Sequence, residues 1–354
     1  MNIQSVAGNK YYLGFLDGAR GLAILMVILV HIGSLITDGA YLIQQTPMFI
    51  NAGARGVQLL FILSAFSLFH SNSIKFPDLT KLNKDFCINF YFRRIIRLYP
   101  LWILISVLII LIKSDYNIYK FLLSSSFAFG FLRFKPNTEI IVGGWAVFSE
   151  LVFYLVFPYL FVKVRNLSSA LKILIISIFA TALWRLLATI YNIPSENSFW
   201  FLFPLFQAYA FGIGIVIYYL YKARYVQIFL TTKWVNIVSL MSVYMISTGN
   251  FDTAVIGISL LFLCSFSKKS IISYIFNTNI LKSVGRLSYS IFLCHFMIIE
   301  ILDRYIHRSQ ITLIDYANEY RIMIWFAIVL MVSFIFSYFL HELIEIPILR
   351  KYSK

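Results

Sequence analysis

Phe15-Leu-Asp-Gly-Ala-Arg-Gly-Leu-Ala-Ile-Leu-Met-Val-Ile-Leu-Val-His31 is the stretch from which the fold follows. Asp17 and Arg20 give it a charged start, and ten uncharged residues separate Arg20 from His31. On an α-helix, which rises about 1.5 Å per residue, Arg20 and His31 lie roughly 16 Å apart. With Arg20 at one membrane face, His31 lies near the middle of a hydrocarbon core about 30 Å thick. An ionisable side chain there normally faces the bundle interior or a watery cavity, and it marks function. The alternative is a neutral histidine that is hydrogen-bonded between helices.

The composition extends this interpretation to the whole chain. Of the 354 residues, 60% are hydrophobic and 13% are charged, and the mean hydropathy is +0.82. A soluble domain is far less apolar, so we predict an all-α polytopic membrane protein that forms a single domain over residues 1–354. Residues 120–133 are apolar but too short to cross, which predicts an interfacial or re-entrant segment. About ten transmembrane helices are expected, at 15–36, 55–71, 96–113, 146–162, 172–190, 203–221, 234–249, 252–267, 287–302 and 323–341.

The distribution of Lys and Arg sets the orientation. With the N-terminus inside, the inner segments hold 21 of these residues and the outer segments hold 8. This bias predicts that both termini are cytoplasmic. The net charge of +15 is then a topological signal, and no nucleic-acid partner is expected. The three cysteines are scattered without metal-ligand spacing, so neither a disulfide framework nor a metal site is expected.

A basic cluster opens the third predicted span. Arg93, Arg94 and Arg97 lie within about one helical turn in the stretch from Tyr91 to Pro100. Guanidinium groups present planar forks of donors that suit phosphate. The cluster therefore indicates either a nucleotide-bearing ligand such as coenzyme A, or a positive anchor that touches anionic lipid.

Two further polar positions fall within predicted spans. Glu150 lies about five residues into its span, roughly 7 Å from the outer face, where a carboxylate could orient a histidine and raise its basicity. Its alternative role is a structural pair with Arg185 or Arg55. His295 follows Arg286 by nine residues, about 14 Å on a helix. This depth resembles that of His31 and suggests a shared polar centre, although a lone histidine is more often a structural hydrogen-bonder.

These stretches, in this order, resemble the acyltransferase 3 family of bacterial membrane O-acyltransferases. Ala146, Gln58 and Ala65 stand where the family often has a serine, an acid and a glycine. The motifs that carry the resemblance are Leu16-Asp17-Gly18-x-Arg20-Gly21 with His31, Gly56-Val57 with Phe61-x-Leu63-Ser64, Arg93-Arg94-x-x-Arg97-x-x-Pro100, Trp145-x4-Glu150-x2-Phe153-Tyr154-x3-Pro158, Ser288-Tyr289-Ser290 with His295, and His341-Glu342 with Glu345-x-Pro347.

The resemblance implies a ten-span enzyme of the bacterial cytoplasmic membrane. Such enzymes take an acyl group, usually acetyl, from cytoplasmic acyl-CoA and place it on a hydroxyl of a cell-envelope glycan or lipid-linked sugar. Acetyl-CoA or another acyl-CoA is then the donor substrate. The oligomeric state, monomer or homodimer, stays open. By this resemblance His31 is the catalytic histidine, Arg20 is its partner, Glu150 joins the catalytic group, Arg93, Arg94 and Arg97 bind acyl-CoA, and Asp17, Tyr154, His295, Ser288 and Tyr289 form a supporting polar centre.

Two other classes of protein compete with this interpretation. A transporter or flippase of an anionic solute would also use guiding arginines and buried ions, but it favours repeated halves with broken helices, which the sequence does not show. A lipid-binding structural protein would explain the basic loops, but not histidines within two spans.

Overall fold

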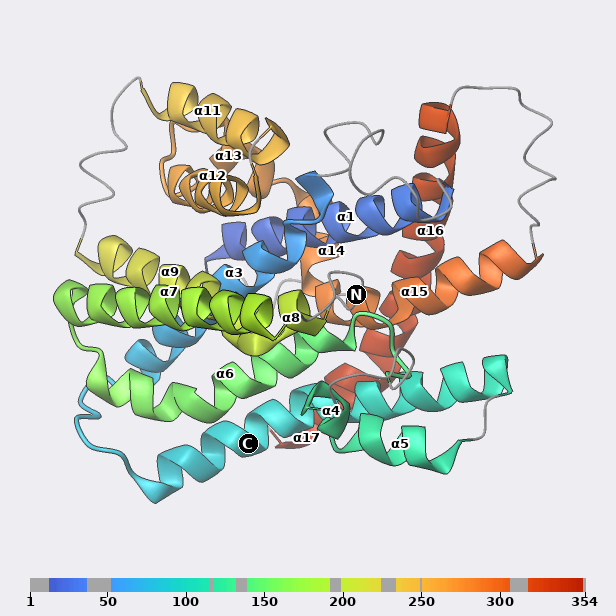
Figure 1. Cartoon of the computed structure of the whole chain (residues 1–354), viewed down its shortest axis with the longest axis horizontal. Helices are drawn as coiled ribbons and strands as arrows, with labels where there is room; N and C mark the ends of the chain where they lie inside the picture. Colours follow the sequence, from blue (N-terminus) through green and yellow to red (C-terminus); the bar gives the residue numbers. More distant parts are fainter. Residues whose placement is uncertain are drawn as a thin grey trace. The chain divides into compact units, whose positions relative to one another are not determined.

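The computed structural model describes residues 13–36, 52–114, 117–131, 139–191, 199–223, 234–248, 250–305 and 318–352. In this part of the chain all regular structure is helical, as the sequence predicts (Figure 1). The principal helices are α1 (Gly14–Ile36), α3 (Gly56–Lys75), α4 (Lys84–Lys113), α5 (Ile118–Ser125), α6 (Gly144–Lys163), α7 (Leu167–Ile190), α9 (Pro204–Lys222), α11 (Val235–Thr248), α12 (Phe251–Cys264), α15 (Ser288–Tyr305) and α16 (Asn318–Leu340). Shorter helical pieces are η2 (Ala128–Phe131), α8 (Phe199–Leu202), α13 (Ile271–Phe276), α14 (Asn279–Arg286), η4 (His341–Glu345) and α17 (Ile346–Tyr352).

Helix length separates clear membrane spans from shorter segments. Among the described residues, seven helices are long and apolar enough to cross a membrane, and the pair α14–α15 makes up to eight. Helices α11 and α12 have 14 residues each, about 21 Å, which is less than a hydrocarbon core of about 30 Å. A multi-pass membrane protein is thus supported. The count of ten spans and the cytoplasmic termini stay predictions.

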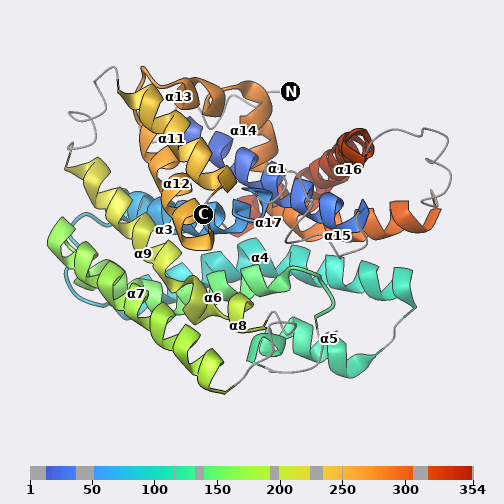
Figure 2. The same ribbon diagram turned by 45° about the horizontal axis from the view of Figure 1, so that its top comes forward.

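The chain forms two compact units. Figure 2 shows the same helices turned by 45°. Each unit is described separately below, because each has its own packed interior. Unit 1 consists of 1–78, 210–288 and 316–326, and unit 2 consists of 79–209, 289–315 and 327–354.

Unit 1 is organised around α1, which packs against α3 and α14. Its interior is aromatic: the ring of Phe66 on α3 contacts the rings of Tyr218 on α9 and of Phe262 on α12. Helices α11 and α12 pack against each other as a helical hairpin. The side chain of Asn250 accepts a hydrogen bond from the Thr253 N–H at 3.0 Å, so it caps the start of α12.

In unit 2, α4 begins twelve residues before the predicted span of 96–113. Asn83 precedes the helix in extended conformation, and its side chain accepts the Asp85 N–H at 2.7 Å. This N-cap starts a helix where hydropathy alone does not. The helix therefore starts earlier than predicted, and Arg93 lies in its third turn, whereas the prediction that the arginines open the membrane-crossing part stays a prediction. A helix needs about twenty residues to cross a membrane. A twenty-residue stretch of α4 that ends at Lys113 begins at Arg94.

The segment that we predict to be interfacial or re-entrant folds back on α4. After α5 the backbone turns at Phe127, which has φ 57°, and continues into η2. The indole of Trp102 on α4 donates to the Ser124 carbonyl at 3.0 Å and stacks on the ring of Phe129. Residues 132 and 133 of the predicted segment of 120–133 lie outside the described residues.

A helix break separates Arg286 from His295. Helix α14 ends at Arg286, and α15 begins at Ser288. The depth of about 14 Å that we predict for His295 assumes one straight helix from Arg286 and is wrong for that reason. Counted within α15, His295 is seven residues from Ser288, about 10 Å along the helix.

Candidate active site

Arg20 on α1 is fixed by two partners in unit 1. Its Nη1 lies 3.1 Å from the Asp17 Oδ1, one turn earlier on α1, and its Nη2 donates to the Ser67 Oγ on α3 at 2.8 Å. The side chain of Arg20 is 23% exposed, so a guanidinium that is paired with Asp17 and held in one position reaches the surface in part. Ser67 was not identified from the sequence, because a serine within an apolar helix carries no signal of its own.

His31 lies on the same face of α1 as Arg20. Eleven residues at about 100° each make three full turns with roughly 20° left over, which places both side chains on one stripe. His31 is half-buried between Val30 and Ile32, which are buried. The separation of about 16 Å along the axis is too great for a hydrogen bond between them. The resemblance implies that Arg20 is the partner of His31, but it is not a contact partner in this structure.

Gly18 on α1 and Gly285 on α14 allow these helices to pack closely. A Cβ added to Gly18 would lie 1.8 Å from the Phe276 carbonyl oxygen, and one added to Gly285 would lie 1.7 Å from the Asp17 carbonyl oxygen. Only residues without a Cβ allow α1 to approach α14 and the end of α13 this closely. The glycines thus determine where the Asp17–Arg20 pair lies within unit 1.

The three arginines of α4 do not point the same way. Arg93 and Arg97 are exposed, whereas Arg94 is half-buried. The Arg94 guanidinium carbon lies 5.4 Å from the ring centroids of both Phe90 and Tyr154. Arg94 is therefore held by cation–π contacts, and the two exposed guanidiniums remain on the outside of the same helix, where a phosphate could reach them.

Glu150 and Tyr154 lie beside Arg94. The Tyr154 hydroxyl donates to the Glu150 Oε1 at 2.5 Å, across one turn of α6. Tyr289 on α15 donates its hydroxyl to the Leu98 carbonyl on α4 at 2.7 Å, and it lies within the electrostatic influence of Glu150, Tyr154 and Arg97. We call Arg94, Arg97, Glu150, Tyr154 and Tyr289 the α4–α6 cluster. It unites five of the predicted site residues within unit 2.

A second polar group adjoins Tyr289 and was not assigned a role from the sequence. Ser290 donates to the Glu345 Oε1, and the His341 Nδ1 lies 2.9 Å from the Glu345 Oε2. His341 and Glu345 flank the π-helical turn η4, a feature that is frequent at functional sites. The motif that ends in Glu345-x-Pro347 gives the sequence signal for this group, but the pairing requires the fold.

The remaining predicted residues lie apart from these groups. Ser288 begins α15 and is half-buried. His295 is fully buried, and its Nδ1 lies 2.7 Å from the Phe292 carbonyl of its own helix, which assigns the proton to Nδ1. His31 lies in unit 1 and His295 in unit 2, so the two histidines are described separately. Arg185, offered above as a structural partner of Glu150, has its guanidinium carbon 4.6 Å from the Phe206 ring centroid.

A comparison with known protein families bears on what these groups do. The family model of the acyltransferase domain Acyl_transf_3 matches residues 13–344. This range includes the α1 residues, the α4–α6 cluster, Ser290 and His341, and it ends one residue before Glu345. Neither the search of curated proteins nor the search of solved structures returned a match. Because the match covers nearly the whole chain, this membrane protein belongs to the acyltransferase 3 family.

Proposed function

We propose that the protein transfers an acyl group, most simply acetyl, from cytoplasmic acyl-CoA to a hydroxyl of a cell-envelope glycan or lipid-linked sugar. The site of action would be the bacterial cytoplasmic membrane, and the charge bias supports a donor that arrives from inside. The observation that carries the proposal is the arrangement on α1. A fixed, partly exposed arginine and a half-buried histidine share one helix face in a chain of an acyltransferase family.

His31 acts on the acceptor hydroxyl in this proposal. As a general base, its imidazole removes the hydroxyl proton while the oxygen forms a bond to the thioester carbonyl carbon. The carbon–sulfur bond then breaks, and the coenzyme A thiolate leaves and takes up a proton. Alternatively, the imidazole nitrogen first takes the acyl group and passes it to the hydroxyl. Both routes yield the same ester and free coenzyme A.

Arginines provide the binding of the donor. Arg93 and Arg97 are exposed on α4, and guanidinium forks match the phosphate oxygens of coenzyme A. Arg20 belongs to unit 1, where it is paired with Asp17. Since it lies about 16 Å along α1 from His31, we do not assign it to orientation of the imidazole.

Acyl transfer by protein in nanodiscs tests this function. The assay follows the release of coenzyme A and the acylation of an envelope-glycan preparation, with hydrolysis of acyl-CoA measured separately. His31→Ala should abolish transfer, and membrane insertion should persist because an apolar replacement inserts more easily. His70→Ala is the matched control, since His70 lies on α3 of the same unit, near the Phe66 ring, and should keep transfer.

Two outcomes bear directly on the alternatives. Near-normal transfer by His31→Ala would overturn the proposed role of His31, whereas the absence of transfer by wild-type protein would favour the transporter class. Mass spectrometry of the envelope glycans from cells with and without the gene identifies the acceptor. A stable acyl adduct on wild-type protein, absent from His31→Ala, would select the acyl-histidine route over the general-base route.

A further inference from the structure

A pocket lies in unit 2 at the C-terminal end of α4. Its volume is about 270 Å³, slightly below the roughly 300–1,000 Å³ of pockets for drug-sized ligands, so it suits a group of the size of one sugar ring. Its walls are apolar, with Ile109, Ile110 and Ile140 among them. Its polar groups are Lys113 at the end of α4, Lys120 on α5, and Glu139 before α6.

Glu139 is a carboxyl group in an unusual environment. Its Oε2 is buried without a hydrogen-bond partner. Burial raises the pKa of Glu139 to about 7, although the N–H groups of Gly144 and Trp145 at the start of α6 act in the opposite direction. Near neutral pH this carboxyl group is therefore present in both protonation states. In its neutral form it can donate a hydrogen bond, and it does not repel an anion.

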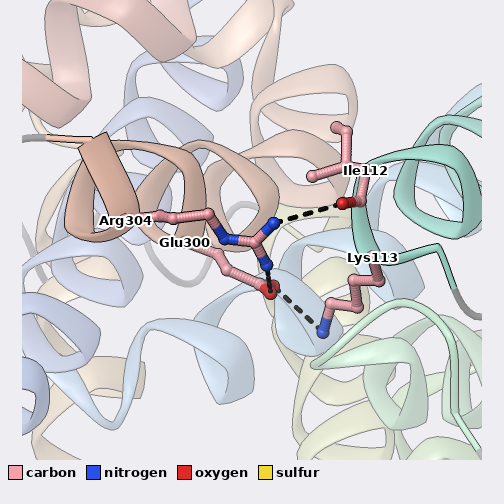
Figure 3. A network of polar contacts seen from close by, with 4 residues as sticks. All are labelled: Ile112, Lys113, Glu300 and Arg304. Atoms are coloured by element: carbon pink, nitrogen blue, oxygen red, sulfur yellow. Dashed lines mark hydrogen bonds and ion pairs between the residues drawn. The ribbon is translucent and has the colours of Figure 1, made fainter.

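The end of α4 that carries Lys113 is held in place by α15 (Figure 3). The Lys113 Nζ lies 2.9 Å from the Glu300 Oε2, and Arg304 contacts the same carboxylate at 3.4 Å. Arg304 also donates to the Ile112 carbonyl at 3.2 Å. The backbone N–H of Lys120 donates to the Asn117 side chain at 3.2 Å, which caps the start of α5. Among the described residues, Lys120 and the Glu300-paired Lys113 thus border the pocket together with the partly neutral carboxyl group of Glu139.

The pocket and the exposed arginines lie at opposite ends of α4. Sixteen residues separate Arg97 from Lys113, about 24 Å on a helix, which is most of the thickness of a hydrocarbon core. A ligand in the pocket therefore approaches from the membrane face opposite to the arginines. Under the proposed function the donor binds at the arginines and the acceptor belongs to the cell envelope, so the pocket lies at the end of α4 from which that acceptor would arrive.

We propose that this pocket binds the acceptor and selects a sugar that carries an acidic group. Lys113 and Lys120 attract the acid, Glu139 hydrogen-bonds to it or to a neighbouring hydroxyl, and the isoleucines pack against the C–H face of the ring. This assignment rests on the proposed acyl transfer, since it gives that reaction its acceptor. A neutral sugar of the same shape would lose the ionic contacts and bind more weakly.

A pair of small glycosides tests the pocket. Methyl glucuronide and methyl glucoside differ only in the carboxylate, and their binding to the full chain in nanodiscs of zwitterionic lipid is measured at about pH 6.5 by ligand-observed NMR. Wild type should prefer the glucuronide by about tenfold, the size of a charge-assisted contact. Lys120→Gln should remove most of this preference, and Lys120→Arg should retain it. Lys81→Gln, an exposed lysine before α4, should leave the preference unchanged.

The outcomes separate this inference from the proposed function. Equal binding of the two glycosides, or a full preference in Lys120→Gln that folds normally, would overturn the acidic-sugar site. Binding of short-chain phosphatidylglycerol in place of the glucuronide would overturn it in favour of a lipid headgroup. Acyl transfer to a neutral glycan without glucuronide binding would overturn the site alone. Glucuronide binding that depends on Lys120, without any acyl transfer, would instead overturn the proposed function and leave an acidic-sugar site.

Discussion

The Tyr154 hydroxyl donates to the Glu150 Oε1 at 2.5 Å across a single turn of α6, beneath the guanidinium of Arg94. This relationship makes Glu150 a carboxylate that is held by its own helix and approached by a cation from α4. Such a group can orient or relay a proton only while the tyrosine keeps it in place. The pair therefore gives the first prediction.

Glu150→Gln should lower the turnover of acyl transfer by roughly 10²–10⁴, the range for a general acid–base contribution. Tyr154→Phe removes only the hydrogen bond to a charged group, which is worth about 1.5–3 kcal/mol, and should lower turnover by about 10–100-fold. Tyr159→Phe, an exposed tyrosine on the same helix, is the control. Steady-state kinetics at saturating acyl-CoA measures all three. Unchanged turnover in Glu150→Gln would assign the pair to structure alone.

The double variant of His31 and Glu150 tests whether both residues act on one proton. Residues that act as a unit are non-additive, so His31→Ala with Glu150→Gln should transfer no more slowly than His31→Ala alone. Single-turnover rates, corrected for hydrolysis of acyl-CoA, provide the measurement. A further loss in the double variant, multiplying the two single effects, would mean that the residues act in separate steps.

The arginines of α4 should separate into two kinds. Arg97→Ala removes an exposed charge and should raise the KM for acyl-CoA by about 10–100-fold, since a charge-assisted contact contributes about 1.5–3 kcal/mol, with little change in thermal stability. Arg94→Ala should also lower the unfolding temperature, because its guanidinium packs on Phe90 and Tyr154. Lysine at either position should rescue incompletely, since it lacks the planar fork.

Lys163→Ala, at the C-terminal end of α6, controls for loss of charge in the arginine experiment. A normal KM for acyl-CoA in Arg97→Ala and Arg94→Ala, combined with reduced expression, would mean that the cluster is only a topological anchor.

Gly18→Ala should destabilise unit 1. The new methyl carbon would lie 1.8 Å from the Phe276 carbonyl oxygen, and backbone cannot yield as a side chain does, so we expect a loss of about 3 kcal/mol or more. Leu25→Ala on the same helix is the control, because truncation of a half-buried side chain should cost about 1 kcal/mol. Thermal unfolding in nanodiscs compares the two. An equal or smaller loss in Gly18→Ala would argue against the close approach of α1 to α13.

The raised pKa of Glu139 predicts that the stability of the folded chain depends on pH. Its pKa is raised from 4.5 to about 7 in the folded chain, so folding favours the neutral acid. The resulting stability is fully present below about pH 4.5 and is lost as pH rises through about 7. Compared with Glu139→Gln, wild type should lose unfolding temperature between pH 5 and pH 8, with a ceiling of about 3 kcal/mol at about 1.4 kcal/mol per pKa unit.

Asp78→Asn, at an exposed carboxyl before α4, controls for removal of an acid from the surface and should show a constant difference from wild type. Among the described residues, the charged groups around Glu139 are Lys113 and Lys120, with Glu300 and Arg304 of α15 beyond Lys113. A difference between wild type and Glu139→Gln that does not change with pH would contradict the prediction.

Hydropathy predicted the helical class and the position of each apolar segment, because burial in lipid requires long apolar helices. It did not predict where α4 begins, since that depends on the cap provided by Asn83, nor the break after Arg286. Residue type and spacing indicated Arg20 and Glu150 as candidates, and the family resemblance added Tyr154; their roles stay predictions. Ser67 and the pairing of Ser290 with Glu345 required the fold, because these contacts join residues 47 and 55 positions apart.

Charge bias and motif order do not distinguish residues of the same type that lie on different faces of a helix. Arg93, Arg94 and Arg97 form one cluster in the sequence, yet Arg94 packs inward and the other two are exposed. Nothing in the sequence indicated the pocket at the end of α4 either. Glu139 lies in a predicted outer loop, and its burial depends on α4, α5 and α6 together.

The π-helical turn η4, between α16 and α17, has a consequence for how this part of the chain can change in length. A π turn holds one residue more than an α turn, so removing one residue from 341–345 would restore uninterrupted α-helical spacing and rotate α17 by about 100°. Glu345 would lose its alignment with His341, and Tyr352 would turn away from the Phe92 ring, which it now contacts. Aligned relatives are therefore expected to differ here by a single-residue gap, which separates chains that keep this turn from chains whose last helix is straight.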